Sequence, residues 1–213
     1  MMCREERTRQ TGSVQTFHGV VGLALVGVLF AVGPHVGYSA DRPHAPALVV
    51  ELNGYADLVG RTLLPAELAR LTTASSSSRL EIQALRAALL YRADPVRYRA
   101  ALSSQFAVHD YAPRSKGLTE DISQEEFILK IKQIEQAYPS LHPTFVLLVS
   151  FVQFRDANLW FSQGSQKLSV SRFVRGAFFA HAFKGSTLDA VSVASALDQE
   201  ARLQYERDAA SKR

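Results

Sequence analysis

TFVLLVSFVQF, residues 144–154, is the most hydrophobic stretch of the chain after residue 40, and its conformation decides the fold. Its β-branched and aromatic residues would suit a strand, and periodicity alone does not exclude one. Pro143 directly before it and the helical pattern that continues through 155–160 favour a helix. The sequence therefore predicts a helix over 144–161 that is buried on most sides and forms the centre of the core.

Helical patterns on both sides of this stretch predict an all-α fold, a single domain of about six or seven helices. The clearest pattern lies upstream, where Ser123 and Glu126 match a capping box. In this motif the hydroxyl accepts from the third helical N–H and the carboxylate reaches back to the cap. Apolar residues then recur at helical spacing as far as Tyr138, and Pro139 ends the helix.

The other helices before residue 120 are predicted from shorter patterns. Apolar residues at helical spacing predict one helix over 48–63, although two glycines within it weaken the pattern. Pro65 begins a second helix, since proline suits the first helical position. A third is capped at Ser78 and ends at Asp94, where Asp94 and Pro95 together begin the next one.

The last helix is predicted to begin near residue 188 and to place its apolar residues on one face. On its outer side, Asp198, Arg202 and Glu206 are spaced for a ladder of i,i+4 ion pairs exposed to solvent. The apolar face consists of Leu188, Val191, Ala194, Ala201 and Tyr205.

Residues 19–33 contain no charged or hydrogen-bonding side chain, and Pro34 closes the run. Three arginines and two glutamates precede it, and small residues follow it at 37–40. A positive region, an apolar stretch of about 7–15 residues and a small-residue exit are the parts of a secretory signal peptide. We therefore expect residues 1–40 to be a cleaved signal peptide and 41–213 to be an exported helical domain.

Two alternatives to cleavage stay open for the apolar run. One is retention as a single-span anchor with the domain outside, although a spanning helix needs about 20 apolar residues. The other is a helix buried in a cytosolic protein. A periplasmic or other exported location is the expectation, and membrane contact is expected only through 19–33, if this segment is uncleaved.

Composition excludes several kinds of chemistry for the part after residue 40. It holds 21 basic and 18 acidic residues without a dense Lys/Arg block, so no nucleic-acid partner is expected. It contains no Cys and no Met, because Cys3, Met1 and Met2 all precede it. A thiolate nucleophile, a disulfide and Cys-ligated zinc are therefore excluded there. No dinucleotide, phosphate-loop or serine-hydrolase motif occurs, and no cofactor is predicted.

Histidines and acids give weak catalytic signals. No two histidines stand at the i,i+4 spacing of a helix-borne zinc site. His109 beside Asp110 resembles an oriented base, but adjacent side chains point in different directions, and His181 is expected to be a hydrogen-bonded core or boundary residue. An acidic cluster offers paired carboxylates for hydrolysis, but acids are also favoured at a helix N-terminus. Its members are Glu120, Asp121, Glu125 and Glu126.

A stretch of aromatic and basic residues from Trp160 to Lys184 is the candidate surface for a partner. Trp and Arg are enriched at interface hot spots, and similar residues occur on helices that lie on membranes. Within it, Ser169 or Ser171 caps a helix that ends at Gly185. Its four Phe residues spread around the helix axis, which is typical of a buried helix. Three interpretations of this stretch stay open: burial in the core, a partner surface and a lipid surface. The residues selected for partner binding are Trp160, Phe161, Arg172 and Arg175.

The function expected from these observations is an exported cell-envelope protein that binds or scaffolds another envelope protein without catalysing a reaction. This expectation rests mainly on the motifs that are missing from the sequence. The alternative is an envelope hydrolase that uses carboxylates and acts on cell-wall polymers. Such an enzyme leaves almost no local signature in a sequence, because its acids can come from distant positions.

The first prediction concerns export. If 19–33 is the apolar part of a signal peptide, protein purified from its native cells should begin close to residue 41, because the signal peptidase cuts after the small residues. Intact-mass measurement checks this. If the protein in the membrane fraction still carries Met1 or Met2, residues 19–33 are instead a membrane anchor.

Overall fold

The structure is a computed structural model of the 213-residue chain that describes residues 45–74, 77, 79–107, 120–155 and 157–213. These residues belong to one compact unit, Ser39–Arg213. The predictions for residues 1–40, for the cap at Ser78 and for the pair of His109 and Asp110 lie outside the described residues.

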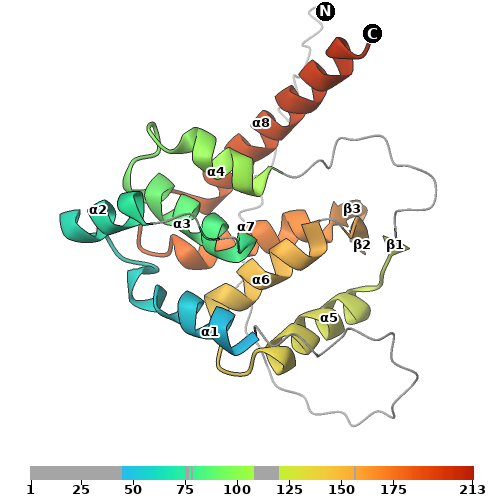
Figure 1. The fold of residues 1–213 in the computed structure, drawn as a ribbon. Coiled ribbons are helices and arrows are strands. Elements are labelled where there is room, and N and C mark those ends of the chain that lie inside the picture. The colour runs from blue at the N-terminus through green and yellow to red at the C-terminus, as the bar shows by residue number, and fades with distance from the viewer. Residues whose placement is uncertain (1–44, 75–76, 78, 108–119, 156) are drawn as a thin grey trace, which may run out of the picture. The chain divides into compact units, whose positions relative to one another are not determined.

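The all-α prediction is confirmed, since the described part of the chain forms eight α-helices with one short 3-10 helix and a small sheet (Figure 1). Of these helices, none has both the length and the apolar character needed to cross a bilayer. The α-helices are α1 (Ala45–Asn53), α2 (Pro65–Thr73), α3 (Leu80–Ala93), α4 (Arg99–Phe106), α5 (Gln124–Ala137), α6 (Pro143–Arg155), α7 (Val170–Ala182) and α8 (Ala190–Ser211). The remaining elements are η1 (Ala56–Leu58), β1 (Glu120–Asp121), β2 (Leu159–Gln163) and β3 (Gln166–Ser169).

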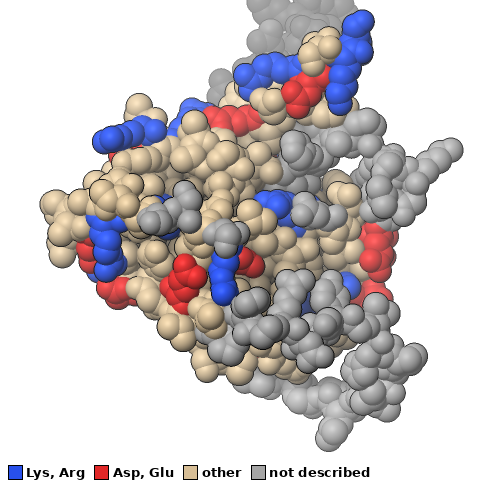
Figure 2. Space-filling view, viewed as in Figure 1, with Lys and Arg blue, Asp and Glu red and all other residues tan. Residues whose placement is uncertain are grey.

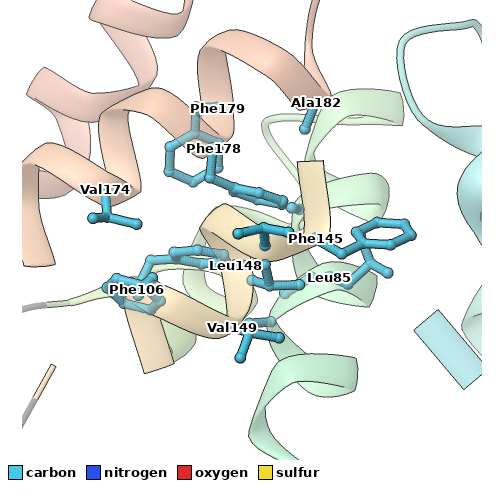
Figure 3. Close-up of a cluster of buried hydrophobic side chains, with 14 of the residues drawn as sticks. Leu85, Phe106, Phe145, Leu148, Val149, Val174, Phe178, Phe179 and Ala182 are labelled. Carbon is cyan, nitrogen blue, oxygen red and sulfur yellow. The ribbon is translucent and has the colours of Figure 1, made fainter. Parts of the chain in front are cut away.

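The hydrophobic stretch 144–154 is helical, and α6 lies at the centre of the core. Eight of its 13 residues are buried, which leaves little of the helix for solvent. It packs most extensively on α7 and also contacts α3 and α5. Figure 3 shows Phe145 and Leu148 of α6 in one apolar cluster with Leu85 of α3, Phe106 of α4 and Phe178 of α7.

The prediction that this helix continues to residue 161 is wrong. α6 ends at Arg155, and Asn158 has a left-handed backbone with φ of 49°. Asn adopts this conformation more readily than most residues other than glycine, so it suits a sharp change of chain direction. Residues 159–161 then enter β2, where Leu159 and Phe161 are buried on one side and Trp160 alternates with them. Aromatic residues favour such a half-buried strand.

The polar stretch after β2 forms a hairpin. β2 pairs with β3 in antiparallel register, with Phe161 opposite Leu168. The two strands are joined through Gly164, whose φ of 59° is the left-handed value that short hairpin turns require. β1 adds a short parallel strand on the other side of β2, with Glu120 opposite Leu159. This small sheet is the only one in the described ranges.

The prediction of one helix over 48–63 is also wrong, because α1 ends at Asn53. Gly54 follows directly, and the chain then makes the short helix η1. Gly60 has φ of 77°, and its N–H donates to the carbonyl of Ala182 at the end of α7, at 3.1 Å. The glycines therefore turn the chain back toward α7 instead of extending the helix.

Arg92 of α3 also joins the chain around η1 to the end of α7. Its guanidinium donates to the carbonyl of Ala182 at 2.9 Å and to the carbonyl of Leu58 at 2.5 Å. Both carbonyls lie at helix ends, where the backbone lacks partners within the helix. Partial burial, followed by repulsion from Arg61, lowers the pKa of Arg92 from its ordinary value.

Most of the predicted helix starts are confirmed. The capping box of α5 forms, with Ser123 N–H donating to Glu126 at 2.7 Å and Glu126 N–H donating back to the Ser123 hydroxyl at 3.1 Å. Ser169 caps α7, and Pro65 begins α2. The start predicted at Asp94 is wrong by one turn, because residues 95–98 form a turn before α4 begins at Arg99.

The second prediction concerns the core. Phe151→Ala should destabilise the protein by about 2–5 kcal/mol, because the side chain is fully buried and its removal leaves a cavity. Leu129→Ala on the exposed side of α5 is the control and should change the free energy of unfolding by less than about 0.5 kcal/mol. Urea unfolding of the three proteins measures both values. If Phe151→Ala lowers the free energy of unfolding as little as the control variant does, α6 is not central to the core.

Candidate partner-binding site

The four residues selected from the sequence do not share one exposed surface. Phe161 of β2 and Arg175 of α7 are buried, and Trp160 is half-buried. Arg172, in the first turn of α7, is the only one of the four that is exposed. Arg172 and part of Trp160 are therefore accessible at the surface, whereas Phe161 and Arg175 lie beneath it, and contact of these residues with a partner stays a prediction.

Arg175 connects three helices inside the fold. Only 1% of its side chain is exposed. Its guanidinium donates to the carbonyl of Phe106 at the end of α4, at 3.0 Å, and forms an ion pair with Asp198 of α8. A buried charge needs such partners, because removing it from water is costly. Arg175 therefore braces α7 against α4 and α8.

The prediction that Asp198 lies on the outside of the last helix is wrong. Arg202 and Glu206 do form the expected pair at 2.9 Å, but Asp198 faces α7. The buried face of α8 is also rotated relative to the predicted apolar face, so that Val191 is exposed. Asp198 lies beside Leu197 in the buried stripe, and this position directs its carboxylate toward the arginines of α7. The buried residues of α8 are Val193, Leu197 and Ala201.

Three phenylalanines from three different elements meet where α5, β2 and α7 come together. Phe127 of α5 stacks on Phe161 of β2 with ring centroids 5.1 Å apart. Phe173 of α7 meets both rings edge to face, at 5.7 Å from Phe127 and 5.6 Å from Phe161. These are favourable aromatic geometries, worth about 0.5–1.5 kcal/mol per pair beyond the area they bury. We call Phe127, Phe161 and Phe173 the aromatic platform.

Phe173 is the exposed member of the aromatic platform. Its residue is 42% exposed, whereas Phe127 and Phe161 are buried. The ring therefore presents apolar surface to solvent while two neighbours hold its orientation. Arg172 beside it is also held, because Asp198 accepts from its guanidinium at 2.8 and 2.5 Å. Phe173 and Arg172 are thus each held in a fixed position at the surface of α7, Phe173 by the aromatic platform and Arg172 by Asp198.

The sequence did not identify Phe127 and Phe173 as site residues. From the sequence, Phe127 is one of the helically spaced apolar residues between Ser123 and Tyr138, and Phe173 is one of the four phenylalanines of the helix that ends at Gly185. Three of those four are buried, namely Phe178, Phe179 and Phe183. The spacing of Val174 and Phe178 marks the inner face of α7, and Phe173 lies about 100° away from it. Its contacts require the hairpin, which the sequence did not predict.

Two members of the acidic cluster, Asp121 and Glu126, are used in local structure. Asp121 pairs with Lys167 of β3 at 2.6 Å. Glu126 caps α5, and its hydrogen bonds with the backbone and hydroxyl of Ser123 lower its pKa. The pKa of Glu67 is lowered to about 2, chiefly by its hydrogen bond from Arg61, and that of Asp189 is lowered by hydrogen bonds from Ser192. A carboxylic acid that donates a proton near neutral pH needs a raised pKa, so these lowered values suit capping.

Histidines and surface charge give no further site. Within the ranges that the structure covers, no three His, Cys, Asp or Glu side chains are grouped to hold a metal ion. His181 is exposed on α7, so the prediction that it is a core or boundary residue is wrong. On the face seen in Figure 2, described basic and acidic side chains are interspersed and do not gather into a patch of one sign.

Comparison of the chain with protein-family models, with curated proteins and with solved structures finds no match.

The third prediction separates the two arginines of α7. Arg175→Met should destabilise the protein by about 3–5 kcal/mol, because it leaves Asp198 in a partly buried position with one partner fewer. Arg172→Met should cost less than about 1 kcal/mol, because this pair is close to solvent. Denaturant unfolding of both variants measures the difference. Equal losses would contradict the distinction between an internal brace and a surface residue.

Proposed function

We propose that the chain is a non-catalytic binding protein that contacts another protein through Phe173 and Arg172. The observation that carries the proposal is the exposed ring of Phe173, fixed edge-on against Phe127 and Phe161. A ring that is already held in place loses little conformational freedom when a partner covers it. Preorganised apolar surface next to an arginine is typical of the residues that dominate binding energy.

The charged rim supports the same role. Arg172 is tied to Asp198, and Lys167 of the adjoining hairpin is tied to Asp121. Interfaces commonly place an apolar centre inside a polar rim that remains hydrated. A partner that fits this surface has an apolar side chain to cover the ring of Phe173 and an acidic or carbonyl group to approach Arg172.

We propose further that the protein works in an exported compartment and that its partner is another protein of the cell envelope. The support for this part is the apolar run at 19–33 with its positive flank and small-residue exit. The hydrolase alternative has no comparable support, because Asp121, Glu126 and Glu67 are engaged in ion pairs and caps.

The fourth prediction tests this surface by photo-crosslinking in the native cells. A benzophenone amino acid replaces Ala180, which is exposed two turns after Phe173 on α7. The expected result is a discrete adduct whose second protein is identified by mass spectrometry. With that protein purified, Phe173→Asp should weaken binding by a factor of about 30 or more, as expected for a hot-spot residue.

Two controls accompany the experiment. The same amino acid at Val96, the most exposed large apolar residue described, should give no such adduct. Leu203→Asp on α8 introduces the same charge at an exposed apolar residue and should leave the affinity within about twofold, because residues outside an interface contribute little. Unchanged affinity for Phe173→Asp, with the fold intact by circular dichroism, would refute the proposed surface.

A further inference from the structure

α8 is attached to the rest of the fold differently from the central helix. Only three of its 22 residues are buried, compared with eight of the 13 residues of α6. Two of its larger apolar side chains, Val191 and Leu203, are exposed. Hydrophobic stabilisation grows with the apolar area removed from water, so the apolar contribution that holds α8 in place is small for its length.

Ion pairs contribute a large share of the interactions that attach α8 to the rest of the fold. Asp198 binds Arg172 and Arg175 of α7. Glu200, half a turn further on, binds the guanidinium of Arg99 on α4 at 2.5 Å and also accepts from the hydroxyl of Ser103. The two carboxylates therefore connect α8 to α7 and to α4, the helices with which its contacts are most extensive.

The C-terminal half of α8 carries hydrogen bonds between its own side chains. Arg202 donates to Glu206 at 2.9 Å, and Gln204 donates to Asp208 at 2.8 Å. Asp189 caps the helix by accepting from backbone N–H groups at its start. Such caps and i,i+4 pairs stabilise a helix without neighbours. In Figure 1 this C-terminal half continues beyond α4.

We propose that α8 is a detachable helix, which separates from α4 and α7 while the remaining helices stay packed, and that the ion pairs of Asp198 and Glu200 hold it closed. Elements with few buried apolar contacts open at a lower free energy than the whole fold does. Ion pairs that are partly exposed are screened by salt, so ionic strength should set how often α8 separates. Separation uncovers the surfaces of α4 and α7 that Val193 and Leu197 now cover.

Native-state hydrogen exchange on the full chain tests this proposal. Backbone amides at 193–201 should exchange faster than those of α6 and should depend less on added denaturant, because a local opening exposes less surface than global unfolding. Raising NaCl from about 0.05 to 0.5 M should accelerate exchange at 193–201. Glu200→Gln should accelerate it by about three- to tenfold, since the charged hydrogen bond to Ser103 and the ion pair with Arg99 are weakened.

Ile82→Val distinguishes local separation from global unfolding. Ile82 is buried on α3, and losing one methyl group should accelerate exchange in α6 by about two- to tenfold. Exchange at 193–201 should not change, because the separated state keeps the packing of Ile82. Glu206→Gln is the charge-matched control, since Glu206 pairs only within the exposed half of α8 in the described contacts, and it should leave exchange at 193–201 within about twofold.

Two results would overturn the proposal. If Ile82→Val accelerates exchange at 193–201 and in α6 equally, α8 unfolds only with the whole domain. If α8 opens separately but neither salt nor Glu200→Gln changes its exchange, the ion pairs do not hold it. Because Phe173 and Arg172 are unchanged in every variant, either result leaves the proposed partner surface to be judged by its own experiment.

Discussion

Burial of α6 is the constraint on which the other elements depend. A helix with eight buried residues out of 13 needs neighbours on most of its sides, and α3, α5 and α7 provide them. The aromatic rings of Phe106, Phe151 and Phe178 close the contact between α4, α6 and α7, with centroids 5.0 and 5.7 Å from Phe106. Because interiors are close-packed, the positions of these helices are set together.

The hairpin after α6 follows from the same constraint and creates the candidate site. α6 ends at Arg155 and the chain turns at Asn158, so β2 begins beside the core and carries Phe161 into it. Phe127 of α5 and Phe173 of α7 already flank this place, and the three rings pack together. The exposed edge of Phe173 is thus a consequence of how α5, β2 and α7 meet.

Charge has a structural role at the other side of α7. Arg175 is buried only because Phe106 and Asp198 supply partners for its guanidinium. Asp198 also binds the exposed Arg172, so one carboxylate links the interior brace to an arginine at the surface. The attachment of α8 and the order of the candidate surface therefore share a residue, although they are separate properties of the fold.

The sequence alone determined the all-α class, the central position of 144–154 and the capping box at Ser123, because these depend on local hydrophobicity and on hydrogen bonds between residues close in the chain. Only the tertiary structure decided that Trp160 and Phe161 lie in a strand, that Arg175 and Asp198 pair, and that Phe173 is exposed. Strand pairing, ion pairs between helices and the exposure of one side of a helix all depend on residues distant in sequence, and a local pattern contains no information about which distant residues meet.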